Sequence, residues 1–267
     1  NALTSKKYIN LGYANQYVKN GDYKAALKIL SKNLQLFNKD IETLQNIANV
    51  YLISSDFSKA ESAYRTIGFS PQNKLTSLNG LALVSHLKGK NRKALEISSK
   101  AINYINNKTT EALLQQTKER YAQAIIWNRK YKKATILIEK LNKEYPDKNW
   151  VLSLRASLNI YKSDFEKSLN DYNRILKNDT SSFDGNLGKA NALKASGYFI
   201  EAYKSAENTL NFYKEQKDVV HFLRKLDKSF TPFVVTESSY SFDNGNNKAY
   251  SYKATSEFSF STKFKLL

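Results

Sequence analysis

The sequence predicts an all-α fold, a right-handed superhelix of about six helical hairpins closed by a capping helix, with a short C-terminal tail of β-hairpin character. Two observations predict the helical part. Similar residue types recur roughly every 34 residues, and small residues recur at two fixed positions of each repeat. A third observation predicts the tail, where apolar and polar residues alternate. We therefore divide the chain into a helical part, residues 1–228, and a tail, residues 229–267.

Each predicted hairpin pairs a helix A with a helix B. The residues that mark the hairpins are, in chain order, Tyr17 and Gly21, Tyr51 and Phe57, Leu81 and Gly89, Ile125 and Tyr131, Leu152 and Phe165, and Leu193 and Gly197. The small residues of helix A are Ala14, Ala48, Ala82, Ala122, Ala156 and Ala190. Those of helix B are Ala26, Ala60, Ala94, Ala134, Ser168 and Ala202. Only small side chains let two helix backbones approach closely, so these positions predict where the helices of each hairpin touch. The amphipathic stretch from Val219 to Leu226 then predicts a helix that caps the last hairpin.

This pattern resembles the tetratricopeptide repeat (TPR) family over about residues 7–216. Four residues depart from the family pattern: Asn10 and Asn186 replace the first large residue, and Arg155 and Lys189 stand where leucine is usual. The resemblance implies a protein that binds a partner along a concave groove lined by the A helices.

The position that follows the small residue of helix A is expected to face this groove, and it carries Asn15, Asn49, Leu83, Gln123, Ser157 and Asn191. Amides satisfy a peptide backbone and sugar hydroxyls equally well, and aromatic faces suit apolar side chains and pyranose rings. The predicted partner-binding residues are Asn15, Gln45, Asn49, Asn79, Gln116, Gln123, Trp127, Trp150, Tyr161 and Asn191. The alternative is that they are solvated surface residues of an asparagine-rich protein. Leu11 and Gln45 stand where chaperone-binding relatives carry lysine, which disfavours chaperone tails as ligands.

In the tail, alternation from Tyr250 to Leu266 predicts a long half-buried strand, and a weaker strand runs from Thr236 to Phe242. Between them, residues 243–247 contain Asn-Gly, a dipeptide favoured where a hairpin needs positive φ. The second strand has the length and alternation of an outer-membrane β-barrel strand. The alternatives are a hairpin that folds back on the last helices or a disordered end.

The order of repeats, capping helix, Thr231-Pro232 junction and tyrosine- and phenylalanine-rich strands resembles the outer-membrane porins that export exopolysaccharides such as cellulose and poly-N-acetylglucosamine. That resemblance implies a periplasmic scaffold attached to the outer membrane through sequence after the tail, with a periplasmic protein or a polysaccharide in the groove. The alternative is a soluble adaptor, cytoplasmic or periplasmic, that binds a peptide segment. Since the chain begins at Asn1 and contains no methionine, we expect a processed or excised fragment, so the lack of a signal peptide says nothing.

The formal net charge is +18, nearly all of it on the helical part. Two inter-helix turns concentrate it: Lys88, Lys90, Arg92, Lys93, Arg129, Lys130, Lys132 and Lys133. An anionic polymer on this edge is one hypothesis, a solvated edge is the simpler one, and nucleic acid is not the expected partner.

No catalytic, metal or cofactor site is predicted. Cysteine is absent, which excludes disulfides and cysteine-zinc sites. His86 and His221 lie far apart in the sequence, and no phosphate-binding glycine motif is present.

Overall fold

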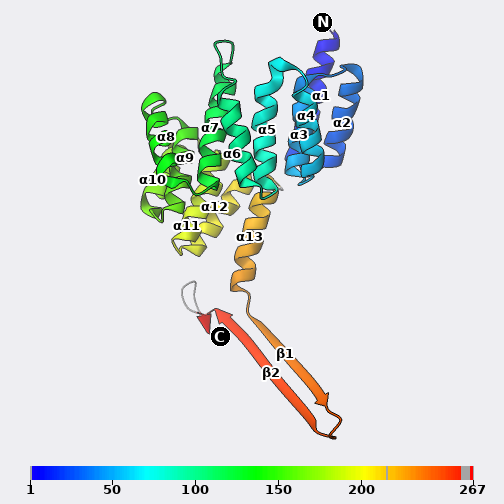
Figure 1. The fold of residues 1–267 in the computed structure, drawn as a ribbon, viewed down its shortest axis with the longest axis vertical. Helices are drawn as coiled ribbons and strands as arrows, with labels where there is room; N and C mark the ends of the chain where they lie inside the picture. Colours follow the sequence, from blue (N-terminus) through cyan, green and yellow to red (C-terminus); the bar gives the residue numbers. More distant parts are fainter. Residues whose placement is uncertain (1, 215, 260–264, 267) are drawn as a thin grey trace.

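The structure, a computed structural model, describes residues 2–214, 216–259 and 265–266. The described chain forms antiparallel helical hairpins stacked side by side into a superhelix, followed by a projecting β-hairpin (Figure 1). The helices are α1 (Ala2–Lys19), α2 (Tyr23–Leu36), α3 (Ile41–Ile53), α4 (Phe57–Ile67), η1 (Pro71–Asn73), α5 (Lys74–Leu87), α6 (Asn91–Ile102), α7 (Glu111–Trp127), α8 (Tyr131–Glu144), α9 (Asn149–Tyr161), α10 (Phe165–Asn178), α11 (Phe183–Ala195), α12 (Phe199–Phe212) and α13 (Lys217–Phe230). Six hairpins and a capping helix are therefore present, as the sequence predicts.

The small residues of both registers lie in the helix contacts, as predicted. The alanine side chains of the helix A register are 0–1% exposed, and those of the helix B register, with Ser168, are 0% exposed. Larger apolar residues such as Leu30, Ile138 and Ile175 fill the space around them. The buried residues form several separate clusters along the chain, because each hairpin buries its apolar surface mainly against its neighbours.

Every turn between helix A and helix B has the same backbone geometry. One residue of each turn has φ between 58° and 83°: Gly21, Ser55, Gly89, Arg129, Ser163 and Gly197. The next residue donates its N–H to a carbonyl five residues earlier, for example Asp22 to Tyr17 O at 2.9 Å. This left-handed C-terminal cap satisfies the last carbonyls of helix A and reverses the chain. The six turns are spaced 34 residues apart, except for a longer step that contains the connection between α6 and α7.

Polar contacts explain three of the four departures from the repeat pattern. Arg155 donates two hydrogen bonds to the buried Asp171 of α10, from Nε at 2.7 Å and from Nη2 at 2.5 Å. Asn10 donates to Asn33 Oδ1 at 3.1 Å. Asn186 is 2% exposed and donates to Thr180 O at 3.0 Å. A buried polar group is tolerated when its hydrogen bonds are made, so these substitutions fit the core. Nothing in the described structure explains Lys189.

The superhelix brings its two ends together. At the start of α13, Lys217 Nζ lies 4.9 Å from the ring centroid of Tyr23, at the start of α2. A cleft of about 700 Å³ between these elements is lined by residues of the first two inter-helix turns and of α13. The capping helix therefore reaches the first hairpin as well as the last.

The tail is an antiparallel hairpin of β1 (Phe233–Phe242) and β2 (Lys248–Ser259), which projects away from the helices beyond α13 (Figure 1). In its register Tyr240 faces Tyr250 and Val234 faces Ser256, so one face is rich in aromatic and apolar residues. The opposite face carries Ser239 and Ser251, whose hydroxyls are 2.7 Å apart. This hairpin is amphipathic, yet its described side chains are exposed or partly exposed on both faces.

Two expectations for the tail are corrected. The long strand predicted to reach Leu266 ends at Ser259, and β3 (Lys265–Leu266) pairs antiparallel with its end. The intervening residues 260–264 lie outside the described residues. In the hairpin turn the residue with positive φ is Asn246, not Gly245, because the Asp243 carboxylate accepts the N–H groups of Gly245 and Asn247 and fixes the turn. The helical part runs to Phe230, two residues past the predicted boundary.

Candidate functional site

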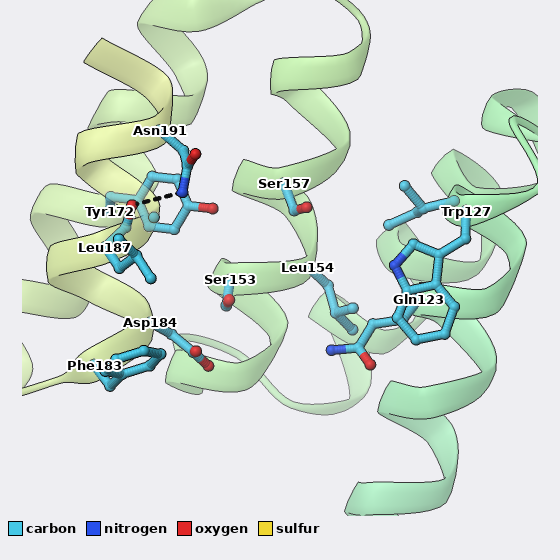
Figure 2. A pocket seen from close by; sticks show the side chains of 12 residues that line it. Gln123, Trp127, Ser153, Leu154, Ser157, Tyr172, Phe183, Asp184, Leu187 and Asn191 are labelled. Atoms are coloured by element: carbon cyan, nitrogen blue, oxygen red, sulfur yellow. Dashed lines mark hydrogen bonds between the residues drawn. The ribbon is translucent and has the colours of Figure 1, made fainter. Parts of the chain in front are cut away.

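The inner surface of the superhelix contains two neighbouring hollows, formed mainly by the A helices. The first, of about 290 Å³, lies between α3, α5 and α7, and we call it the N-terminal hollow. Its main lining residues are Gln45, Asn49, Tyr64, Asn79, Gln116 and Arg120. The second, of about 220 Å³, lies between α7, α9 and α11, and we call it the C-terminal hollow (Figure 2). Its main lining residues are Gln123, Trp127, Ser153, Ser157, Asp184 and Asn191.

Seven of the ten predicted groove residues line these hollows. Those of the N-terminal hollow are Gln45, Asn49, Asn79 and Gln116, and those of the C-terminal hollow are Gln123, Trp127 and Asn191. The residue that follows the small residue of helix A faces a hollow in every repeat from the second onward, as expected. Leu83 and Ser157, which complete this set, line the hollows too. The two hollows adjoin through α7, which lines both of them, and the partner-binding role of these residues stays a prediction.

The other three predicted residues lie elsewhere. Asn15 is exposed on α1, outside both hollows. Tyr161 is 53% exposed at the end of α9, with its ring 6.0 Å from that of Tyr131 on α8. The placement of Trp150 on the groove surface is wrong, because its side chain is 9% exposed and packs against Tyr145 in the core. Its position in the first turn of α9 directs it towards α8.

Hydrogen bonds fix the polar lining of the N-terminal hollow, but two buried atoms have no partner. The Tyr64 hydroxyl donates to Asn49 Oδ1 at 2.9 Å, and Asn79 Nδ2 donates to Thr117 Oγ1 at 2.8 Å. Within the described part of the chain, Asn79 Oδ1 and Arg120 Nε are buried without a hydrogen bond. Both atoms depart from the rule that buried polar groups are paired, and their burial keeps them out of reach of a ligand in the hollow.

Side chains of α7 that are hydrogen-bonded to one another link the two hollows. Sequence reasoning missed the charged members of this chain of hydrogen bonds. Arg120 Nη1 donates to Gln123 Oε1 at 2.7 Å, and Gln123 Nε2 donates to Glu119 Oε1 at 3.2 Å. Burial raises the pKa of Glu119 to about 7; the charge of Asp184 adds to the increase and that of Arg120 opposes it. The spacing Gln116, Arg120, Gln123 and Trp127 on α7 is that of one helix face, so helical periodicity could have placed Arg120 in the groove.

Trp127 offers less aromatic surface to a ligand than the sequence suggests. The ring of His86 stacks on it with centroids 3.6 Å apart and an interplanar angle of 4°, and the Arg120 Cζ lies 5.8 Å from its centroid. Burial lowers the pKa of His86, which favours the neutral imidazole in this stack. The face of Trp127 covered by His86 cannot hold a pyranose ring, so the groove offers more hydrogen-bonding groups than stacking surfaces.

Asp184 is the second charged group that sequence reasoning missed. It belongs to the first turn of α11, and Figure 2 shows its carboxylate directed towards the space between α11 and α9. The side chain reaches solvent in the hollow, but the surrounding superhelix limits its hydration and raises its pKa. Among the described residues, no cation lies within 4.0 Å of this carboxylate, although the helix N-terminus favours its charge.

The basic turns lie on the edge of the superhelix, as predicted. Most of their side chains are exposed, whereas Lys88 forms an ion pair with Glu61 at 2.6 Å and Lys133 Nζ lies 5.7 Å from the Tyr121 ring centroid. An anionic polymer on this edge stays a prediction. Over the described ranges no group of three or more histidine, cysteine, aspartate or glutamate residues could hold a metal ion. No helix there has both the length and the apolar character needed to cross a membrane.

Comparisons with known proteins show the fold. No family model and no curated protein matches the chain. Among solved structures it is similar to a thermophilic TPR protein of Thermus thermophilus, at 18% identity and a TM-score of 0.57 over 70% of this chain and 99% of that one. It is also similar to PilW, a widely conserved type IV pilus biogenesis factor, at 13% identity and a TM-score of 0.54 over 81% of this chain and 98% of that one. For PilF of Pseudomonas aeruginosa the identity is 14% and the TM-score 0.52, over 84% and 100% of the two chains. The chain therefore has the TPR superhelical fold.

Proposed function

We propose that this chain is a non-catalytic TPR scaffold that holds an extended segment of a partner protein in its inner groove. Two hollows that share α7 form a continuous surface of amides and hydroxyls, which suits the alternating N–H and C=O groups of an extended backbone. The stacking of His86 on Trp127 favours a protein segment over a polysaccharide as the direct ligand. In this proposal the protein organises an assembly and carries out no chemical step itself.

We further propose that the scaffold is the periplasmic part of an outer-membrane protein that exports an exopolysaccharide. The observation that carries this proposal is the hairpin β1–β2, whose aromatic face is solvent-exposed and whose described residues project from α13 without packing on the helices. A lone hairpin is marginal in water, so this face needs a partner. The second strand, β2, has 12 residues of alternating character and can cross an outer membrane in a tilted orientation. The groove would then recruit a periplasmic protein close to the export channel.

Accessibility in cells tests this arrangement. The 267 residues lack cysteine, so a single cysteine introduced among them marks one site, and the unsubstituted protein gives the labelling background. We would place one at the hairpin tip, Asn244→Cys, and one in the connection between α6 and α7, Asn107→Cys, in the natural full-length protein. A maleimide that cannot cross membranes should label the tip in intact cells and Asn107→Cys only after the outer membrane is permeabilised. Release of both variants in a soluble fraction would refute the outer-membrane proposal.

The second candidate is a soluble adaptor with the same groove. This candidate needs only the fold that the chain shares with PilW and PilF, of whose chains it covers 98% and 100%. The cell experiment separates the two candidates. A soluble adaptor is recovered in the soluble fraction, whether or not its groove binds a peptide.

A further inference from the structure

We propose that the C-terminal hollow is a subsite for a primary ammonium group, namely a lysine side chain of the extended partner segment. This inference deepens the proposed function and rests on it, because it assumes that a protein segment occupies the groove. It assigns a charge preference to one end of that groove.

The first argument is the unpaired charge of Asp184. Of the described side chains that line the hollow, its carboxylate alone is charged, and no described cation lies within 4.0 Å of it. The Asp184 side chain is exposed within the hollow, so its carboxylate is open to a cation supplied by a ligand. The charge of Asp184 contributes to the raised pKa of Glu119 on α7, whereas the charge of Arg120 opposes that increase. A ligand cation would pair directly with the Asp184 carboxylate.

The second argument is the set of acceptors around Asp184. The Ser153 and Ser157 hydroxyls of α9 line the hollow opposite α11 (Figure 2). Asn191 uses its Nδ2 to donate to Leu187 O at 3.0 Å, and its Oδ1 remains as an acceptor. Acceptors are thus supplied from two helices, and an ammonium group has three donors and no acceptor. The chemistry of the lining matches the needs of this group.

The third argument is size and apolar lining. About 220 Å³ is below the roughly 300–1,000 Å³ of most small-molecule pockets, so the hollow suits one side chain and not a larger ligand. Phe183, Leu187 and Leu154 supply apolar walls along which the methylene stem of a lysine can lie. One wall is rigid, because Tyr172 is 4% exposed and fills the space beside Gly188.

The test is selection from a random peptide library on the full chain, at physiological salt. Peptides recovered by the wild-type protein should share a lysine, and Asp184→Asn should lose this enrichment. Asp218→Asn is the matched control, since Asp218 is an exposed acid in the first turn of α13 and lies outside the groove. Non-specific attraction to a chain of net charge +18 favours acidic peptides, so lysine enrichment runs against the overall charge.

The selected peptide then allows a direct measurement by calorimetry. Asp184→Asn should weaken its binding at least about tenfold, the usual range for a hydrogen bond to a charged group. Replacing the lysine by Nε-acetyl-lysine should have a similar effect on the wild-type protein and little on Asp184→Asn. Equal affinities of wild type and Asp184→Asn, or of lysine and acetyl-lysine peptides, would overturn the inference.

Other outcomes separate this inference from the proposed function. Peptides that bind the groove but share no lysine would refute the ammonium subsite and leave the scaffold function standing. Recovery of no peptide would count against a protein ligand altogether. If glucosamine oligomers bind in an Asp184-dependent manner and lysine peptides do not, the ammonium comes from a polymer and the assignment to a protein segment is wrong.

Discussion

Gly80→Ala tests the close packing that shapes the groove. Gly80 lies within α5, and a Cβ there would stand 2.2 Å from Cδ1 and Cε1 of Tyr64, a contact that real Cβ atoms do not make. The ring cannot yield easily, since Tyr64 is 6% exposed and its hydroxyl is bonded to Asn49 at 2.9 Å. A second pair has the same geometry, because a Cβ on Gly188 would stand 2.2 Å from Tyr172 Cε1. We infer that glycine at these positions is what lets a tyrosine of the preceding helix pack beside the groove.

The size of the effect follows from three contributions. Forcing extra atoms into a packed core costs about 1–3 kcal/mol. Loss of the Tyr64 hydrogen bond costs about 1 kcal/mol more, and alanine returns about 1 kcal/mol through its helix propensity. The free energy of unfolding should therefore fall by about 1–3 kcal/mol, or roughly 2–12 °C in Tm for a chain of this size.

The assay is urea or thermal unfolding followed by circular dichroism, with Gly12→Ala as the matched control. Gly12 is also inside a helix, but a Cβ there meets nothing within 4 Å, so Gly12→Ala should stabilise the protein by up to about 1 kcal/mol. In a Tyr64→Ala background Gly80→Ala should no longer destabilise. If Gly80→Ala and Gly12→Ala change stability in the same direction and by the same amount, the packing argument fails.

Three further predictions concern buried charge, pH and the tail. Arg155→Ala should lower the free energy of unfolding by about 3 kcal/mol in urea titrations, because it removes the close ion pair of the buried Asp171 and leaves only Arg174, at 3.9 Å; an equal loss in an Asp171→Asn background would contradict this. The folded-state pKa of Glu119 is about 7 against an ordinary 4.5, so the folded chain retains a proton that the unfolded chain loses, and stability should fall as pH rises from about 4.5 to 7. Glu119→Gln should therefore stabilise the protein at pH 8 by about 1–3 kcal/mol and change little at pH 4; stabilisation of equal size at both pH values would refute the assignment. Truncation after Pro232 should change the free energy of unfolding of the helical part by no more than about 0.5 kcal/mol in urea titrations, since the described tail does not pack on the helices; a larger loss would show that the hairpin supports the superhelix.

The repeats, the turns and the amphipathic hairpin could all be predicted from the order of residues along the chain. Two alanine registers suffice to locate the helix contacts, because only a small side chain permits that approach. The facing register rested on the resemblance to TPR proteins, which implies that the residue after the small position of helix A faces the groove. Asn49, Gln123 and Asn191 line the hollows as that resemblance implies, whereas Asn15 does not.

Which side chains meet across different repeats became clear only from the packed superhelix. Trp150 was misplaced because the first turn of a helix can face the preceding helix as easily as the groove. The interaction of Glu119 with Asp184, the stacking of His86 on Trp127 and the packing of Tyr64 against Gly80 all join residues of different helices. Periodicity within one helix fixes which face a residue occupies, whereas the distance between faces depends on how tightly successive hairpins wind. That winding, and with it the unpaired carboxylate in the C-terminal hollow, is a property of the packed superhelix and of no single repeat.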